Sequence, residues 1–105
     1  MKYNKLVRDK IPEIIKDSGY IYKTHIADDL EYWEMLKAKL KEEVGEVLKD
    51  TNVTEELADV LEVIHAILDF KGITFEELEQ IRLKKKDEKG GFGNKIILEK
   101  TETTQ

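Results

Sequence analysis

The sequence predicts an all-α fold, an antiparallel bundle of about four helices with short extended segments near both ends of the chain. Charged residues make up 39% of the 105 residues and proline occurs once, a composition typical of helices with solvated outer faces. Apolar residues recur at spacings of three and four over long stretches, which is the helical period. Helix-capping residues stand where these stretches begin, and glycines stand where they end.

The first half of the chain predicts two helices with an extended segment between them. Pro12 suits the first turn of a short helix over residues 12–18, which Gly19 would end. Residues 20–26 are β-branched and aromatic, and predict a short strand or an extended arm. An aspartate at position 28 or 29 would cap a long helix that runs to about residue 50.

The second half predicts two further helices. Asn52, followed three residues later by glutamate, is a capping-box-like start for a helix over residues 53–70 that ends near Gly72. Thr74 repeats the device for a helix over residues 75–88. Glycines follow that helix, and residues 95–99 predict a second extended stretch.

The helix expected over residues 53–70 is apolar around most of its circumference. Its apolar positions fall on two sides of a helical projection: Leu57, Leu61, Ile64 and Leu68 on one, and Val60, Val63, Ile67 and Phe70 on the other. Such a helix is normally buried on most sides. Residues 1–105 are enough for one small domain, so we expect oligomerisation, as a homodimer or tetramer, to complete the bundle.

Composition argues against several classes of protein. A net charge of −5 argues against a protein that binds nucleic-acid polymers. We expect no membrane association, because no apolar run reaches the roughly 18 residues of a membrane span. The absence of cysteine excludes disulfides and thiolate zinc sites and fits a cytoplasmic protein.

Four acids on two successive helices do not follow the solvent-facing stripes. Glu43 lies at the edge of an apolar stripe with Glu46 beside it, and on the next helix Glu56 and Asp59 share sectors with valines. Buried carboxylates without partners are costly, and clustered ones repel one another. A divalent cation would resolve both problems, and so would ion pairs with nearby lysines. The periodicity leaves these two interpretations open.

The same acids carry a resemblance to a known family. EEVGE (42–46) followed by ELAD (56–59) resembles the EExxE…ExxD signature of the all-α nucleoside triphosphate pyrophosphohydrolases. KLVRDKIPEII (5–15) and KKKDEKGGFGNKIIL (84–98) resemble the opening and closing segments of its MazG-like, phosphoribosyl-ATP-pyrophosphohydrolase-like subgroup. Residues 47–55 separate the two acidic motifs, a shorter interval than is usual in that superfamily.

The resemblance implies an α-helical fold assembled from two or more chains and a metal-dependent hydrolase. The metal ligands would be Glu43, Glu46, Glu56 and Asp59, holding Mg²⁺ or Mn²⁺, with Glu43 and Glu42 as the catalytic acids. Glu42 would be an outer ligand or a water-orienting base. The activity would be hydrolysis of a nucleotide between its α and β phosphates, which could serve to remove unwanted nucleotides. Phosphoribosyl-ATP hydrolysis in histidine synthesis is an alternative, as is a catalytically silent helical interaction module.

Basic residues near both ends are candidates for contacts to a nucleotide substrate. The candidates are Lys5, Arg8, Lys84, Lys86 and Lys89, together with Gly91 and Phe92 in the glycine-rich segment. Cations and exposed backbone N–H groups suit phosphates, and an aromatic ring suits a base or ribose. The alternative is that the lysines complement the negative end of a helix dipole, and that Arg8 pairs with Asp9.

Overall fold

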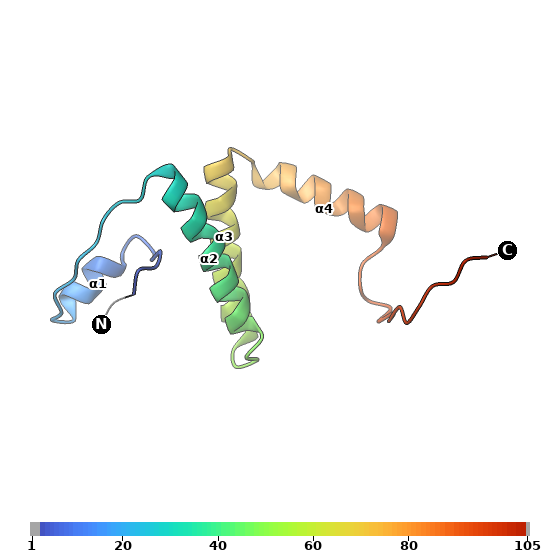
Figure 1. The fold of residues 1–105 in the computed structure, drawn as a ribbon, viewed down its shortest axis with the longest axis horizontal. Coiled ribbons are helices and arrows are strands. Elements are labelled where there is room, and N and C mark those ends of the chain that lie inside the picture. The colour runs from blue at the N-terminus through green and yellow to red at the C-terminus, as the bar shows by residue number, and fades with distance from the viewer. Residues whose placement is uncertain (1–2, 105) are drawn as a thin grey trace. The chain divides into compact units, whose positions relative to one another are not determined.

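A computed structural model describes residues 3–104, which form four α-helices and no β-strand (Figure 1). The helices are α1 (Ile11–Asp17), α2 (Asp29–Val47), α3 (Val53–Lys71) and α4 (Phe75–Lys89). The predicted all-α class is confirmed, and each predicted helix is present with ends that differ by a few residues at most. The chain divides into two compact units, with the boundary between Gly72 and Ile73.

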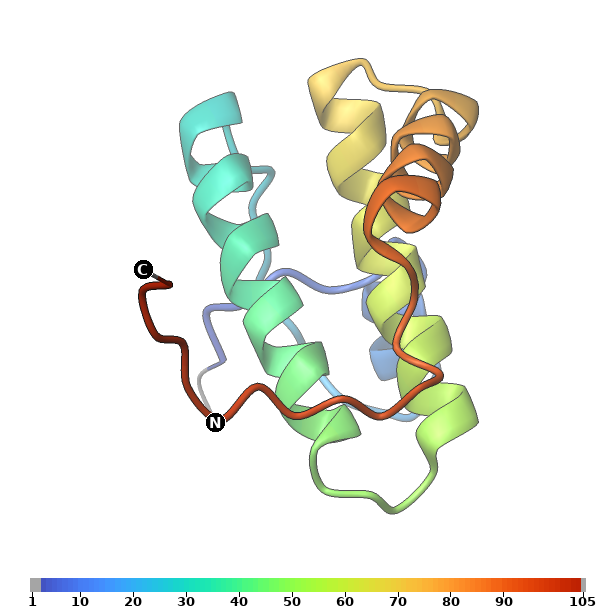
Figure 2. The same cartoon turned by 90° about the vertical axis from the view of Figure 1, so that its right-hand side faces the viewer.

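The first unit is built around α2 and α3, which lie side by side and run in opposite directions (Figures 1 and 2). Residues 48–52 reverse the chain between them in a short turn. Asp28 and Asn52 cap the two helices, each through a side-chain oxygen that accepts a hydrogen bond from a backbone N–H in the first turn. Gly72 ends α3 in the left-handed conformation, with φ of 70°.

The apolar contact between these helices holds the few buried side chains. Leu36 of α2 is 1% exposed, and Val63 and Leu68 of α3 are also buried. Near one end of the pair, the Trp33 ring stacks on Phe70 with 6.1 Å between ring centroids. The pair therefore shares one apolar seam along its length. Within residues 3–104, no helix has both the length and the apolar content that crossing a bilayer requires.

The segment that precedes α1 and the segment that follows it have no regular secondary structure. Leu6 and Val7 are half-buried, whereas the charged residues around them are exposed. Residues 20–26, for which a strand was one expectation, form no strand, because no other described segment of the chain pairs with them. The extended-arm alternative is the one that the structure adopts.

The second unit consists of α4 and the segment after it. Thr74 and Glu77 form the predicted capping box at the start of α4. Gly90 ends the helix with φ of 86°, a backbone conformation that L side chains rarely adopt. None of the α4 side chains is buried, and Phe92 in the following segment is 99% exposed. This unit therefore has no apolar core of its own.

Candidate metal centre

Three carboxylates from two helices converge near the turn that joins α2 to α3. Glu43 is in the last part of α2, and Glu56 and Asp59 are in the first two turns of α3. Each offers a carboxylate oxygen, and these oxygens all lie within 4.8 Å of one another. The antiparallel pairing produces this arrangement, because it places the end of α2 beside the start of α3. All three side chains are half-buried.

Glu43, Glu56 and Asp59 form an acidic triad, and within it the surroundings raise the pKa of the Glu56 carboxyl. Partial burial and the negative charges of Glu46, Asp59 and Glu43 together raise the pKa of the Glu56 carboxyl above its ordinary value. Within the described residues Glu56 forms no ion pair, although the positive charge of Lys49 acts on it from beyond ion-pair distance. The negative charges around Glu56 outweigh this positive charge, because its pKa is raised.

Glu46 lies outside the close triad, although the sequence grouped it with the other three acids. Its carboxylate is 3.0 Å from the Nζ atom of Lys49, one turn further along the chain. Its charge still contributes to the raised pKa of Glu56. The structure thus places Glu46 beside the triad and not within it.

Glu42 is the acid at this site that has two basic partners within the described residues. Its two oxygens accept hydrogen bonds from Lys5 at 3.3 Å and from Lys39 at 3.4 Å, and Lys39 also lies 3.4 Å from Glu43. Desolvation acts to raise the pKa of Glu42, but the hydrogen bond from Lys5 and the charges of both lysines outweigh it and lower that pKa. Glu42 is therefore held in its ionised form.

The N-terminal segment supplies the basic partner of Asp59. A guanidinium nitrogen of Arg8 donates a hydrogen bond of 2.8 Å to a carboxylate oxygen of Asp59, 51 residues away in sequence. The sequence interpretation considered Asp9 or a phosphate as the partner of Arg8 and missed Asp59. The only available signal was the alternation of basic residues with Leu6 and Val7, which would hold the segment against the helices.

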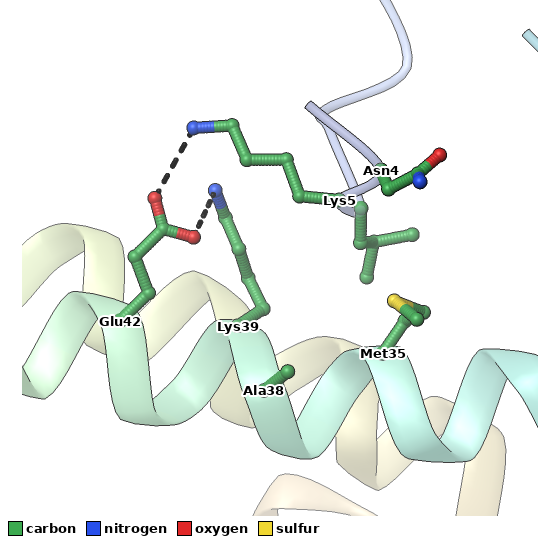
Figure 3. A pocket seen from close by; sticks show the side chains of 7 residues that line it. Asn4, Lys5, Met35, Ala38, Lys39 and Glu42 are labelled. Carbon is green, nitrogen blue, oxygen red and sulfur yellow. Dashed lines mark hydrogen bonds and ion pairs between the residues drawn. The ribbon is translucent and has the colours of Figure 1, made fainter. Parts of the chain in front are cut away.

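A small pocket lies between the N-terminal segment and α2, next to these ion pairs (Figure 3). Its volume is about 140 Å³, and it is lined by Asn4, Lys5, Leu6, Met35, Ala38, Lys39 and Glu42. Figure 3 shows Lys5 and Lys39 reaching the Glu42 carboxylate from the segment and from the helix. The pocket therefore combines apolar walls with the ammonium groups of two lysines at one end.

The remaining predicted substrate contacts belong to the second unit. Lys84, Lys86, Lys89, Gly91 and Phe92 are all exposed there. Lys84 lies 4.0 Å from Glu88, and a Cβ atom added at Gly91 would meet the Lys86 side chain at 3.8 Å, an ordinary contact. Space around Gly91 thus does not require glycine. Contacts of these residues to a nucleotide stay a prediction.

The donor set of the triad fits a hard divalent cation. All the donors are carboxylate oxygens, which suit Mg²⁺, Mn²⁺ and Ca²⁺ better than Zn²⁺. Two oxygens on opposite sides of one Mg²⁺ are about 4.2 Å apart, since each bond is about 2.1 Å. The 4.8 Å limit on the triad exceeds this largest spacing, so the side chains would rotate closer together, or a water would bridge, to hold the ion.

The comparisons with known proteins include one relative that matches part of the chain. A Mycolicibacterium smegmatis protein, described as uncharacterized, is 52% identical over 42 residues, which is 40% of this chain. The match spans 43% of that relative, so the two proteins share less than half of their lengths. No protein-family model matches the chain. No solved structure matches it either.

Proposed function

We propose that the chain is a Mg²⁺-dependent nucleotide pyrophosphohydrolase, with Mn²⁺ as an alternative ion. The observation that carries the proposal is the convergence of Glu43, Glu56 and Asp59 from two helices. These are three of the four acids that the family resemblance implies as metal ligands. A cation there would offset the crowded negative charge that raises the pKa of Glu56.

Each acid would have a distinct part in the reaction. Glu43, Glu56 and Asp59 would hold the ion, and Glu46 could join them only by leaving Lys49. A bound Mg²⁺ supplies charge neutralisation for the phosphates and lowers the pKa of a coordinated water. Glu42 suits the outer, water-orienting role better than that of proton acceptor, because its lowered pKa makes it a weak base.

The substrate class is a nucleoside triphosphate or a related nucleotide. Water would add to the α phosphorus and the bond to the bridging oxygen would break, which releases a monophosphate and pyrophosphate. Lys5 and Arg8 already lie at the acids and would contact the phosphates. We expect the chain to act in the cytoplasm, possible roles there being removal of unwanted nucleotides and phosphoribosyl-ATP hydrolysis in histidine synthesis.

We infer that the working form is a homodimer or tetramer. The observation in favour is the exposed apolar surface of α3, where Leu57 and Leu61 face outward although the helix also packs on α2. A symmetry-related copy would cover these side chains. Light scattering after gel filtration tests this, and a monomer at micromolar concentration would refute it.

A catalytically silent interaction module is the second candidate, and one observation favours it. Four of the five acids at the site already have basic partners, in the pairs Lys5–Glu42, Lys39–Glu43, Lys49–Glu46 and Arg8–Asp59. A purely structural ion-pair network would look similar. The two candidates differ in whether the chain binds a divalent cation and cleaves a nucleotide.

Pyrophosphate release from a nucleotide panel tests the proposed activity. The panel contains standard, deoxy and modified triphosphates and phosphoribosyl-ATP, each with Mg²⁺ or Mn²⁺. We expect at least one substrate to be cleaved, with loss of at least about 100-fold in rate for Glu43→Gln or Asp59→Asn, as is usual when a group that positions the reacting centre is removed. Glu62→Gln is the matched control, because Glu62 is an exposed acid on the same helix. Cleavage of no panel member, with Glu43→Gln behaving like wild type, would reject the enzyme.

A further inference from the structure

The N-terminal segment, residues 3–10, is tied to the helix pair by two ion pairs that both end on acids of the candidate metal centre. Arg8 contacts Asp59 of α3 at 2.8 Å, and Lys5 contacts Glu42 of α2 at 3.3 Å. Asp59 belongs to the acidic triad, whereas Glu42 lies beside it. The partner of Arg8 is therefore a group that a divalent cation would also bind.

We propose that Arg8 is a displaceable counter-ion of this site, so that binding of a divalent cation releases Arg8, and with it the N-terminal segment, from Asp59. The proposal rests on the function proposed above and concerns how that site is regulated. In this structure, Arg8 neutralises Asp59. When the cation binds, Arg8 leaves Asp59 and becomes available to an anionic ligand such as a nucleotide phosphate. Cation binding and phosphate binding are thereby coupled through one side chain.

Displacement follows from the charges at Asp59. A guanidinium and a dication on the same carboxylate would repel each other across a few ångströms. The Arg8–Asp59 pair is half-exposed, with 58% and 42% of the two side chains accessible, and exposed pairs are weak. A dication held by several carboxylates binds Asp59 more strongly than one exposed guanidinium does. The arginine is therefore the group that gives way.

The segment has the structural freedom to move. It has no regular secondary structure before α1, and only Leu6 and Val7 of its described residues are half-buried. Such segments open locally at little cost compared with helices of the core. Loss of the Arg8–Asp59 pair would therefore loosen the segment without disturbing the packing of α2 on α3.

Cation affinity distinguishes displacement from a supporting role for Arg8. Isothermal titration of Mg²⁺ into the full chain is compared for wild type, Arg8→Gln and Lys10→Gln. If Arg8 competes with the cation, Arg8→Gln should bind Mg²⁺ about two- to fivefold more tightly, the range of one exposed ion pair. Lys10→Gln removes an equal charge two residues away that forms no ion pair within residues 3–104, so it reports the through-space effect alone. Equal or weaker binding by Arg8→Gln than by Lys10→Gln would overturn displacement.

Limited trypsin digestion measures how accessible the N-terminal segment is to cleavage. Cleavage after Lys5 and Arg8 of the wild-type chain is measured against cleavage after Arg82, an internal reference in α4. We expect Mg²⁺ to raise the ratio about two- to fivefold. Asp59→Asn should raise cleavage after Lys5 to a similar extent without any cation. An unchanged ratio in either experiment overturns the proposal.

The outcomes separate failure of this inference from failure of the proposed function. Mg²⁺ binding by both wild type and Arg8→Gln, without tightening in the variant, rejects displacement and leaves the metal site standing. Absence of binding in both chains rejects the metal site itself, and displacement with it. Faster cleavage of Asp59→Asn alone would then show only that Asp59 holds the segment in place.

Discussion

A double-mutant cycle on Arg8 and Asp59 measures the contact on which the arrangement of the N-terminal segment depends. The two charged groups are 2.8 Å apart. With the dielectric constant of bulk water, two unit charges at that distance attract by about 1.5 kcal/mol. Fixing two half-exposed side chains in one geometry offsets part of this, so a coupling free energy of about 0.2–1 kcal/mol is expected. The substitutions are Arg8→Gln and Asp59→Asn, singly and together.

The assay is urea unfolding followed by circular dichroism, at low ionic strength and with a chelator present. Coupling should fall towards zero in 1 M salt, where the Debye length is about 3 Å. A second cycle that pairs Lys10→Gln with Asp59→Asn is the matched control and should show no coupling, because Lys10 forms no ion pair in the described chain. Equal coupling in the two cycles at low salt would refute the specific contact between Arg8 and Asp59.

Three further predictions concern the fold and the acidic triad. Leu36→Ala should lower the free energy of unfolding by about 2–5 kcal/mol in urea denaturation, whereas Leu30→Ala, at a side chain that is 75% exposed, should change it by less than about 0.5 kcal/mol; similar losses would contradict the assigned core. Because the pKa of Glu56 is raised, its ionised form costs stability above that pKa and the cost disappears as the pH falls through it. Glu56→Gln should therefore raise Tm at neutral pH in a chelator and lose this advantage on acidification, unlike the control Glu62→Gln, at an exposed acid of the same helix that does not act on Glu56; a gain that does not depend on pH would argue against the repulsion. Thr74→Ala removes the capping box of α4 and should reduce the far-UV helical signal, with a cost of about 0.5–2 kcal/mol to the helix; an unchanged signal would show that the cap is dispensable.

Local signals in the sequence were sufficient to predict where the helices begin and end. Asn52 and Thr74 mark the first residues of α3 and α4 because a cap depends only on side chains within one turn. Gly19 and Gly72 mark helix ends through another local property, because both have a positive φ, which favours glycine. The segment over residues 20–26 shows the limit of such signals. Its strand-like composition could be realised only with a pairing partner, which depends on the rest of the fold.

The candidate site could be predicted only where helical geometry alone determines it. Periodicity placed Glu43, Glu56 and Asp59 at the edges of apolar stripes, and an antiparallel helix pair then brings their oxygens together. The same reasoning grouped Glu46 with them, whereas its side chain turns to Lys49. That choice depends on a rotamer, which spacing does not determine. The partner of Asp59 comes from a segment without helical periodicity, so no sequence rule pointed to Arg8.

Substitution of Glu56 can distinguish an enzyme from a silent module, because of the charge balance at the site. Five carboxylates meet four basic side chains there, and Glu56 is the acid that forms no ion pair in the described chain. In a purely structural network that acid only costs stability, so Glu56→Gln would improve the chain and affect nothing else. In a metal centre the same acid is kept for the cation, so the substitution should raise Tm in a chelator and weaken Mg²⁺ binding together. Destabilising groups retained at functional sites commonly show this exchange of stability for function. A stabilised Glu56→Gln chain with wild-type Mg²⁺ affinity would remove Glu56 from the ligand set, and stabilisation of a chain that binds no Mg²⁺ at all would favour the module.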